Sequence, residues 1–428
     1  MGDVNDSLNS PLGLTWALYK RHKQKQKLAN IQRDNTINRG VVEYLPSQIE
    51  AFFDPGEVLG NIIVSGGDEF IRLRALARVV DCAYSQQYVP IILHTGNYKL
   101  ENYMMNCFGT TNVSYLNGQF PYYEPFEGLT DSDICHIIMN STTPSFEIKG
   151  LGKYYIDGIT GFIRSKGIQP YLWMYITCPH MELNDKVNQA LDDGKISESD
   201  ARRILSQIVQ GELERGNIEN FFSKLKSEAE HIIAKKNNLN RSVSIRETAR
   251  LRRAIVVDIR SSSNDLLINI LMNEIDMLRN SGIRILLCLD GIQTRDNKMI
   301  ENYLLSSGNQ SIVCLTGSDV YTDFSGNDSL FYKVASMSSK IVLSRHLSAF
   351  SCQKLSGLAG EYDKQEISDT YTNNINLIGK FSFGTTTSQN VSTKRESIFK
   401  TEDIARLNND EVYIFDRCNG ELAHTQII

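Results

Sequence analysis

The stretch that decides the fold is residues 61–94, NIIVSGGDEFIRLRALARVVDCAYSQQYVPIILH. It opens with an apolar, β-branched run that ends in Gly66-Gly67, and it closes with a second apolar run, VPIILH. Between the two runs, apolar residues recur at the helical period. We expect strand, helix and strand, with the two strands parallel, because a helical crossover joins parallel strands of one sheet.

The same alternation continues towards the C-terminus. Four further strand-like runs, AIVVDI, RILLCLDG, SIVCLTG and SKIVLSRH, alternate with helical patterns such as residues 264–282. Apolar strands separated by helices indicate a mostly parallel sheet that is covered on both faces, so the fold class is α/β. The Ser/Thr-rich residues 378–397 predict a loop or hairpin, and two short strands follow around residues 418–420, Cys-Asn-Gly.

Residues 181–253 interrupt this pattern, because they hold no strand-like run and keep helical periodicity. We interpret them as an all-α insertion. The predicted organisation is an N-terminal helical arm (1–50), the first part of the α/β domain (51–180), the insertion (181–253) and the second part with C-terminal strands (254–428). The arm contains a basic stretch, KRHKQKQK, which is typical of a solvated helix face more often than of a nucleic-acid contact.

Composition excludes several classes of protein. The chain has 428 residues, 41% of them hydrophobic, and a formal net charge of −5. It is too apolar for a disordered chain and has no global basic field for non-specific nucleic-acid binding. No apolar run approaches the ~20 residues that span a bilayer, and no signal peptide is evident. The eight cysteines form no C-x-x-C pair, so we expect a cytoplasmic protein without disulfides or a metal site.

The Gly66-Gly67 turn stands where a phosphate-binding loop, G-x-x-x-x-G-K-[ST], would begin. With Gly66 as the first glycine, Ile71 replaces the second glycine, Arg72 the lysine and Leu73 the hydroxyl residue. Isoleucine blocks the close approach of phosphates, and leucine offers no oxygen to Mg²⁺. Residues 68–69, Asp-Glu, add negative charge where phosphates would lie. Taken alone, the two glycines predict a tight strand-to-helix turn.

Asp290, at the end of RILLCLDG, lies where a second nucleoside-triphosphatase motif, hhhhDE, places its magnesium-binding aspartate. Gly291 takes the place of the glutamate that would activate water, and Thr316 ends the next strand-like run. An isolated aspartate at a strand end is usually a helix cap. His94, at the end of VPIILH, is similarly more typical of a satisfied strand-end histidine than of a catalytic one.

The order of these segments resembles the HerA/FtsK superfamily of hexameric motor ATPases, and within it the conjugative coupling proteins of the TraG/TraD type. The similar segments are VPIILHTGNYK, YYEPFEGL, the helical insertion and LSGLAGE. The resemblance implies a RecA-like core. The nucleotide-site positions that the resemblance carries over, as remnants, are only Gly66, Gly67, Arg72 and Asp290. It implies no catalytic residue, no metal and no cofactor.

The resulting hypothesis is a catalytically inactive motor-ATPase-like protein that acts as a structural or adaptor subunit of a secretion, conjugation or DNA-handling complex. Its expected partners are proteins of that assembly, including an intact motor ATPase or further copies of the chain. One alternative is a divergent ATPase that translocates DNA or protein, binds ATP and Mg²⁺, and uses Arg72 in place of lysine. The other is a nucleic-acid-binding module, and the candidate nucleic-acid or partner contacts are Arg241, Arg246, Arg250, Arg252 and Arg253.

Overall fold

The computed structural model describes residues 11–56, 60–294, 297–308, 310–375 and 383–428. Its centre is a ten-stranded sheet in the order β1-β12-β11-β8-β2-β7-β6-β3-β5-β4. The seven strands from β8 to β4 are parallel, and β11 is antiparallel to both of its neighbours. The strands are β1 (Val41–Glu43), β2 (Asn61–Ser65), β3 (Val89–His94), β4 (Val113–Leu116), β5 (Ala254–Asp258), β6 (Ile285–Asp290), β7 (Ser311–Gly317), β8 (Ser338–Leu343), β11 (Glu411–Asp416) and β12 (Glu421–Gln426). The predicted α/β class with a mostly parallel sheet is confirmed.

Helices cover both faces of this sheet, which explains the continuous apolar strands. In β2, Ile63 packs into one core, and Ile62 and Val64 pack into the other, on the side of α3. Burial on both sides makes every position of a central strand apolar. The helices that follow the strands are α3 (Glu69–Ser85), α4 (Tyr98–Asn112), α12 (Asp265–Asn280), α13 (Lys298–Leu305), α14 (Val320–Asp323), α15 (Asp328–Ser336), α16 (Ala349–Ser356) and α17 (Thr401–Ala405).

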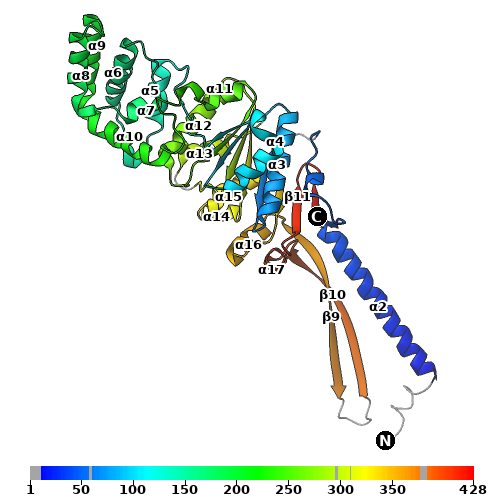
Figure 1. The fold of residues 1–428 in the computed structure, drawn as a ribbon. Helices are drawn as coiled ribbons and strands as arrows, with labels where there is room; N and C mark the ends of the chain where they lie inside the picture. The colour runs from blue at the N-terminus through cyan, green and yellow to red at the C-terminus, as the bar shows by residue number, and fades with distance from the viewer. Residues whose placement is uncertain (1–10, 57–59, 295–296, 309, 376–382) are drawn as a thin grey trace.

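A helical unit stands between β4 and β5, at one end of the molecule (Figure 1). It comprises α5 (Asp131–Asn140), α6 (Gly152–Ser165), α7 (Leu172–Ile176), α8 (Leu183–Asp192), α9 (Glu198–Gly211), α10 (Arg215–Ala229) and α11 (Ile245–Arg250). Its helices begin about fifty residues before the predicted boundary at 181. The glycines of α6 allow close helix packing: a Cβ at Gly158 would lie 2.8 Å from Ile208 Cγ1 of α9.

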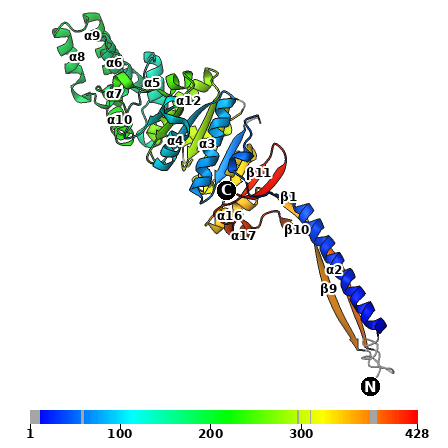
Figure 2. The same cartoon turned by 45° about the vertical axis from the view of Figure 1, so that its right-hand side comes forward.

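The arm projects from the opposite end of the molecule (Figures 1 and 2). This projecting arm combines α2 (Pro11–Arg39), from the predicted N-terminal arm, with an antiparallel hairpin from the C-terminal part of the chain. The strands of the hairpin are β9 (Glu361–Ile375) and β10 (Phe383–Ser397). The range for which the sequence leaves a loop or a hairpin open, 378–397, thus contributes the second strand of a hairpin whose first strand lies before it in the chain. Residues 1–10 of the predicted arm lie outside the described residues. In the described part of the chain, no helix combines the length and apolarity that crossing a membrane requires.

Candidate nucleotide-site edge of the sheet

The polar residues that the sequence singles out meet at the carboxyl edge of the parallel sheet. In register, His94 of β3 lies beside Asp258 of β5 and Asp290 of β6, and Asp290 lies beside Thr316 of β7. Ser65, the last residue of β2, pairs with Gly317. Parallel strands end at one edge, so residues far apart in the sequence form one row. This edge is where open α/β sheets bind ligands.

The turn between β2 and α3 is only three residues long, from Gly66 to Asp68. Helix α3 begins at Glu69, so Ile71, Arg72 and Leu73 lie in its first turns, and Ile71 is buried against the sheet. The second half of the phosphate-loop pattern is therefore helix, not loop. A phosphate loop uses a longer Gly-rich segment, whose backbone N–H groups surround the phosphates. Three residues cannot form that enclosure.

Three backbone amides at this turn already donate to groups of the chain itself. The N–H of Gly66 donates to Gly317 O at 3.1 Å, and the N–H of Gly67 donates to Arg345 O at 2.8 Å. The Asp68 carboxylate caps α3 by accepting from the N–H of Ile71 at 2.9 Å. A helix N-terminus attracts anions. Here a carboxylate of the chain occupies that position, as a helix cap does.

The loop after β8 fills the space above the turn. The N–H of Ser344 donates to Ser65 O at 2.9 Å, and a Cβ built on Gly66 would lie 1.9 Å from Ser344 Oγ. His346 Nδ1 donates to Ser344 O at 2.7 Å, so its Nε2 accepts from the Ser65 hydroxyl, 2.8 Å away. Burial lowers the pKa of His346, which keeps this ring neutral. Ser65 and His346 are both buried, so the pair holds the loop against β2.

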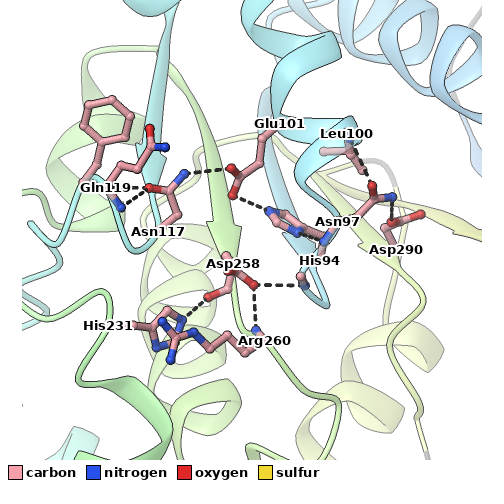
Figure 3. Close-up of polar contacts among 12 residues, drawn as sticks. His94, Asn97, Leu100, Glu101, Asn117, Gln119, His231, Asp258, Arg260 and Asp290 are labelled. Carbon is pink, nitrogen blue, oxygen red and sulfur yellow. Dashed lines mark hydrogen bonds and ion pairs between the residues drawn. The ribbon is translucent and has the colours of Figure 1, made fainter.

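Asp290 is held by its neighbours (Figure 3). Its Oδ1 accepts from Thr316 Oγ1 at 2.6 Å, and its Oδ2 accepts from Asn97 Nδ2 at 2.9 Å. Gly291 has φ 63°, a left-handed conformation that favours glycine. A glutamate at this place would be strained. The backbone therefore gives a structural reason for the glycine where an ATPase carries its water-activating residue.

Carboxylates dominate the electrostatics of this edge. Burial, together with the nearby carboxylates of Asp319 and Asp290, raises the pKa of Asp323 to about 8, against the opposing charge of Arg72. The Arg72 guanidinium donates to Gly66 O. Among the described residues, no group of three or more His, Cys, Asp or Glu side chains is placed to hold a metal ion.

His94 belongs to a second polar cluster at the same edge (Figure 3). It is fully buried; its Nδ1 accepts from the N–H of Asn97 at 3.0 Å, and its Nε2 lies 3.2 Å from Glu101 Oε1. Asn117 Nδ2 donates to the other Glu101 oxygen at 2.8 Å. Asp258 Oδ1 similarly accepts from the N–H groups of Gly96 and Arg260. These contacts stabilise the turns after β3 and β5. Sequence reasoning missed Glu101 and Asn117, because only the tertiary fold brings α4 and the end of β4 to His94.

The five candidate arginines do not form one basic face. Arg246 is buried, forms an ion pair with Glu274 at 3.2 Å and donates to two backbone carbonyls. Arg253 is half-buried and donates to Thr110 O at 2.9 Å. The other three, Arg241, Arg250 and Arg252, are exposed. Because Arg246 is buried and Arg253 is half-buried, a charge count along the sequence overstates the basic surface.

Comparison with known proteins establishes the fold. No protein-family model matches the sequence, and no curated protein matches it significantly. A solved structure of the bacterial conjugative coupling protein TrwBΔN70, in its trigonal form with sulphate, matches with a TM-score of 0.50 at 10% identity, over 89% of this chain and 91% of that one. VirB4 of Thermoanaerobacter pseudethanolicus matches with a TM-score of 0.45 at 11% identity, over 86% and 89% of the two chains. The chain therefore has the RecA-like fold of the coupling protein.

Proposed function

We propose that this chain is a motor-fold subunit that does not hydrolyse ATP and that serves as a structural or adaptor component of a conjugation or secretion machine. The observation that carries the proposal is the three-residue turn from Gly66 to Asp68, which is capped by its own aspartate and covered by the loop after β8. The setting is proposed from the fold shared with a conjugative coupling protein.

The chemistry of ATP hydrolysis supports this proposal. Phosphoryl transfer depends on positioning: backbone amides and a lysine hold the phosphates, a metal bridges them, and a polar residue orients water. Here three of the amides have acceptors within the chain, Arg72 donates to Gly66 O, and both Asp290 oxygens are hydrogen-bonded. A fold can persist as a binding scaffold after the loss of its chemistry, since function resides in the site.

Titration calorimetry of the full chain with ATP and Mg²⁺, together with a phosphate-release assay, tests this proposal. We expect no saturable heat of binding at millimolar ATP and no release above the protein-free blank. The matched variants are Arg72→Ala and Asp290→Asn, which would abolish any nucleotide-dependent signal if a divergent ATPase site existed. Stoichiometric binding or turnover that either variant abolishes would overturn the proposal.

The adaptor role predicts protein partners rather than a chemical product. The arm and the helical unit lie at opposite ends of the molecule, so one subunit offers two separate surfaces (Figures 1 and 2). We propose that these ends connect different components of the assembly, one of them an intact motor ATPase of the same fold. The exposed arginines, Arg241, Arg250 and Arg252, are further candidate contacts, in the segment that leads from the helical unit into β5.

A further inference from the structure

The two long edges of the β9–β10 hairpin differ in what contacts them. On the outer edge of β9, the α2 side chain Asn35 donates to Gln365 O at 2.9 Å and accepts from the N–H of Gln365 at 2.7 Å. Asn38 Nδ2 lies 3.4 Å from Asp363 O on the same edge. Among the strands that the structure describes, β10 pairs only with β9. The helix therefore covers the β9 edge of the hairpin, and no described strand pairs with the β10 edge.

The register shows which groups the open edge presents. Gln365 lies opposite Thr393, and Asp363 lies opposite Arg395. Because Gln365 directs its N–H and C=O away from β10, this is a non-hydrogen-bonded pair, and its partner Thr393 directs its own groups outwards. The alternation of an antiparallel ladder extends this to every second residue. The odd-numbered residues of β10 from 383 to 393 thus offer backbone donors and acceptors along the open edge.

The sequence of the β10 edge lacks the features that usually prevent an edge strand from pairing with another strand. Residues 383–393, FGTTTSQNVST, contain no charged residue and no proline over eleven positions. Natural proteins guard open edge strands with lysine, proline, bulges or very short strands. A long, uncharged, Thr-rich edge without these devices is suited to the addition of another strand.

We propose that β10 pairs antiparallel with β10 of a second copy of this chain. A two-fold axis at Ser388 places residue 387 opposite residue 389, 385 opposite 391, and 383 opposite 393. All of these are odd-numbered, so outward-facing groups meet outward-facing groups and close a four-stranded sheet. An uncharged strand meets its own copy without repulsion. The charged residues Lys394, Arg395 and Glu396 lie outside the paired stretch.

Electrostatic repulsion between the two basic α2 helices does not prevent this pairing. Helix α2 carries seven lysine or arginine residues and one aspartate, so two copies repel each other at short range. Each α2 covers the β9 edge, on the far side of its hairpin from the proposed axis. Three strand spacings, roughly 14 Å, together with the width of the helices separate the two. That distance exceeds the screening length of about 8 Å at physiological salt.

A pair of variants at one position tests the proposal. Gln389→Pro removes an outward-facing N–H, and it leaves the bonds to β9 intact because those come from even-numbered residues. Gln389→Val keeps the N–H. By light scattering on the full chain, we expect dimers for the parent and for Gln389→Val. For Gln389→Pro we expect dimerisation weakened at least about tenfold, since the symmetric contact loses the bond twice.

Cross-linking tests the register in a background in which the exposed Cys107 and Cys418 are replaced by serine. Ser388→Cys places two thiols opposite each other across the axis, whereas Asn390→Cys places them roughly 13 Å apart along the strands. Mild oxidation is expected to link the first variant and not the second. A monomeric parent, a dimer that Gln389→Pro leaves unchanged, or a dimer that cross-links at neither position would overturn the proposal.

Discussion

Gly66 shows how a single residue lets two segments of the chain approach each other closely. Its φ of 144° is in the region that favours glycine, and Ser344 lies where a side chain would begin. A phosphate loop uses glycine so that a phosphate can approach the backbone. At Gly66 the group that approaches is Ser344, a residue of the same chain. A glycine at this place in a sequence therefore indicates that another group lies close to the backbone. The sequence alone does not identify that group.

The first prediction concerns this contact. Gly66→Ala should lower the free energy of unfolding by about 2–3 kcal/mol, because the backbone is strained and the loop after β8 must move. Ser344→Gly in the same chain should recover only part of the loss, since it removes the side-chain clash but neither the 2.9 Å contact with the backbone carbon of residue 344 nor the strain. Urea unfolding of the parent, the single variant and the double variant measures both effects. An unchanged midpoint for Gly66→Ala would contradict the packing described here.

At the scale of elements, the helical unit is joined to the sheet through buried polar contacts. Residue Tyr123 forms backbone bridges to Ile233 and Val243, so the chain segments that lead into and out of the unit lie side by side. The next residue, Glu124, is buried and accepts from the N–H groups of Phe126 and of Leu172 in α7. This glutamate thus joins the segment after β4 to the helices, in a place with little water.

The second prediction follows from the charge of this glutamate. Burial raises the pKa of Glu124 to about 8, so between pH 4.5 and pH 8 the folded state binds a proton that the unfolded state releases. Stability from this group is therefore present at low pH and is lost as the pH rises towards 8. The amide side chain introduced by Glu124→Gln carries no charge over this pH range. The free energy of unfolding should therefore fall less with rising pH in this variant than in the parent.

Urea unfolding at pH 5.5 and pH 8.5 measures the effect of Glu124→Gln. The burial of Glu274, which raises its pKa to about 7, and of Asp323 acts in the same direction, so some decline should remain in the variant. If parent and variant lose the same stability between the two pH values, Glu124 is ionised in the folded protein and the prediction is wrong.

At the scale of the whole molecule, the arm depends little on the body. No described side chain of α2 is buried, and an isolated two-stranded hairpin is marginal in water. Within the arm, polar contacts such as the paired bonds between Asn35 and Gln365 join α2 to the hairpin. A long, thin element of this kind gains order from what it binds, which agrees with the proposed pairing of β10 with a second copy.

The third prediction tests this independence. Asn35→Ala should speed hydrogen exchange in α2 and in residues 361–366 by roughly tenfold, because two hydrogen bonds to one residue are lost. Exchange in the central sheet should not change. Asn30→Ala, at an exposed position of the same helix, is the matched control and should leave exchange in residues 361–366 as in the parent. Faster exchange in β2 or β6 would show that the arm and the body unfold together.

The sequence by itself determined the α/β class, the mostly parallel sheet and some residues at its carboxyl edge, among them His94 and Asp290. Strands such as residues 285–290 are buried on both faces, so their apolar runs are visible without a structure. Helical periodicity predicted an all-α insertion at 181–253, whereas the helices between β4 and β5 begin at Asp131. Charge along the chain did not show that Arg246 is buried.

Only the tertiary structure showed which groups meet at the carboxyl edge and how they are held. The sequence showed that the lysine, the second glycine and the hydroxyl residue were missing from the phosphate-loop pattern. It did not show that α3 begins at Glu69, that Ser344 and Arg345 cover the turn, or that Asn97 and Thr316 hold Asp290. Those contacts join segments up to about 280 residues apart in the chain. Local sequence patterns report local conformation and burial, whereas a site at a sheet edge depends on which strands become neighbours.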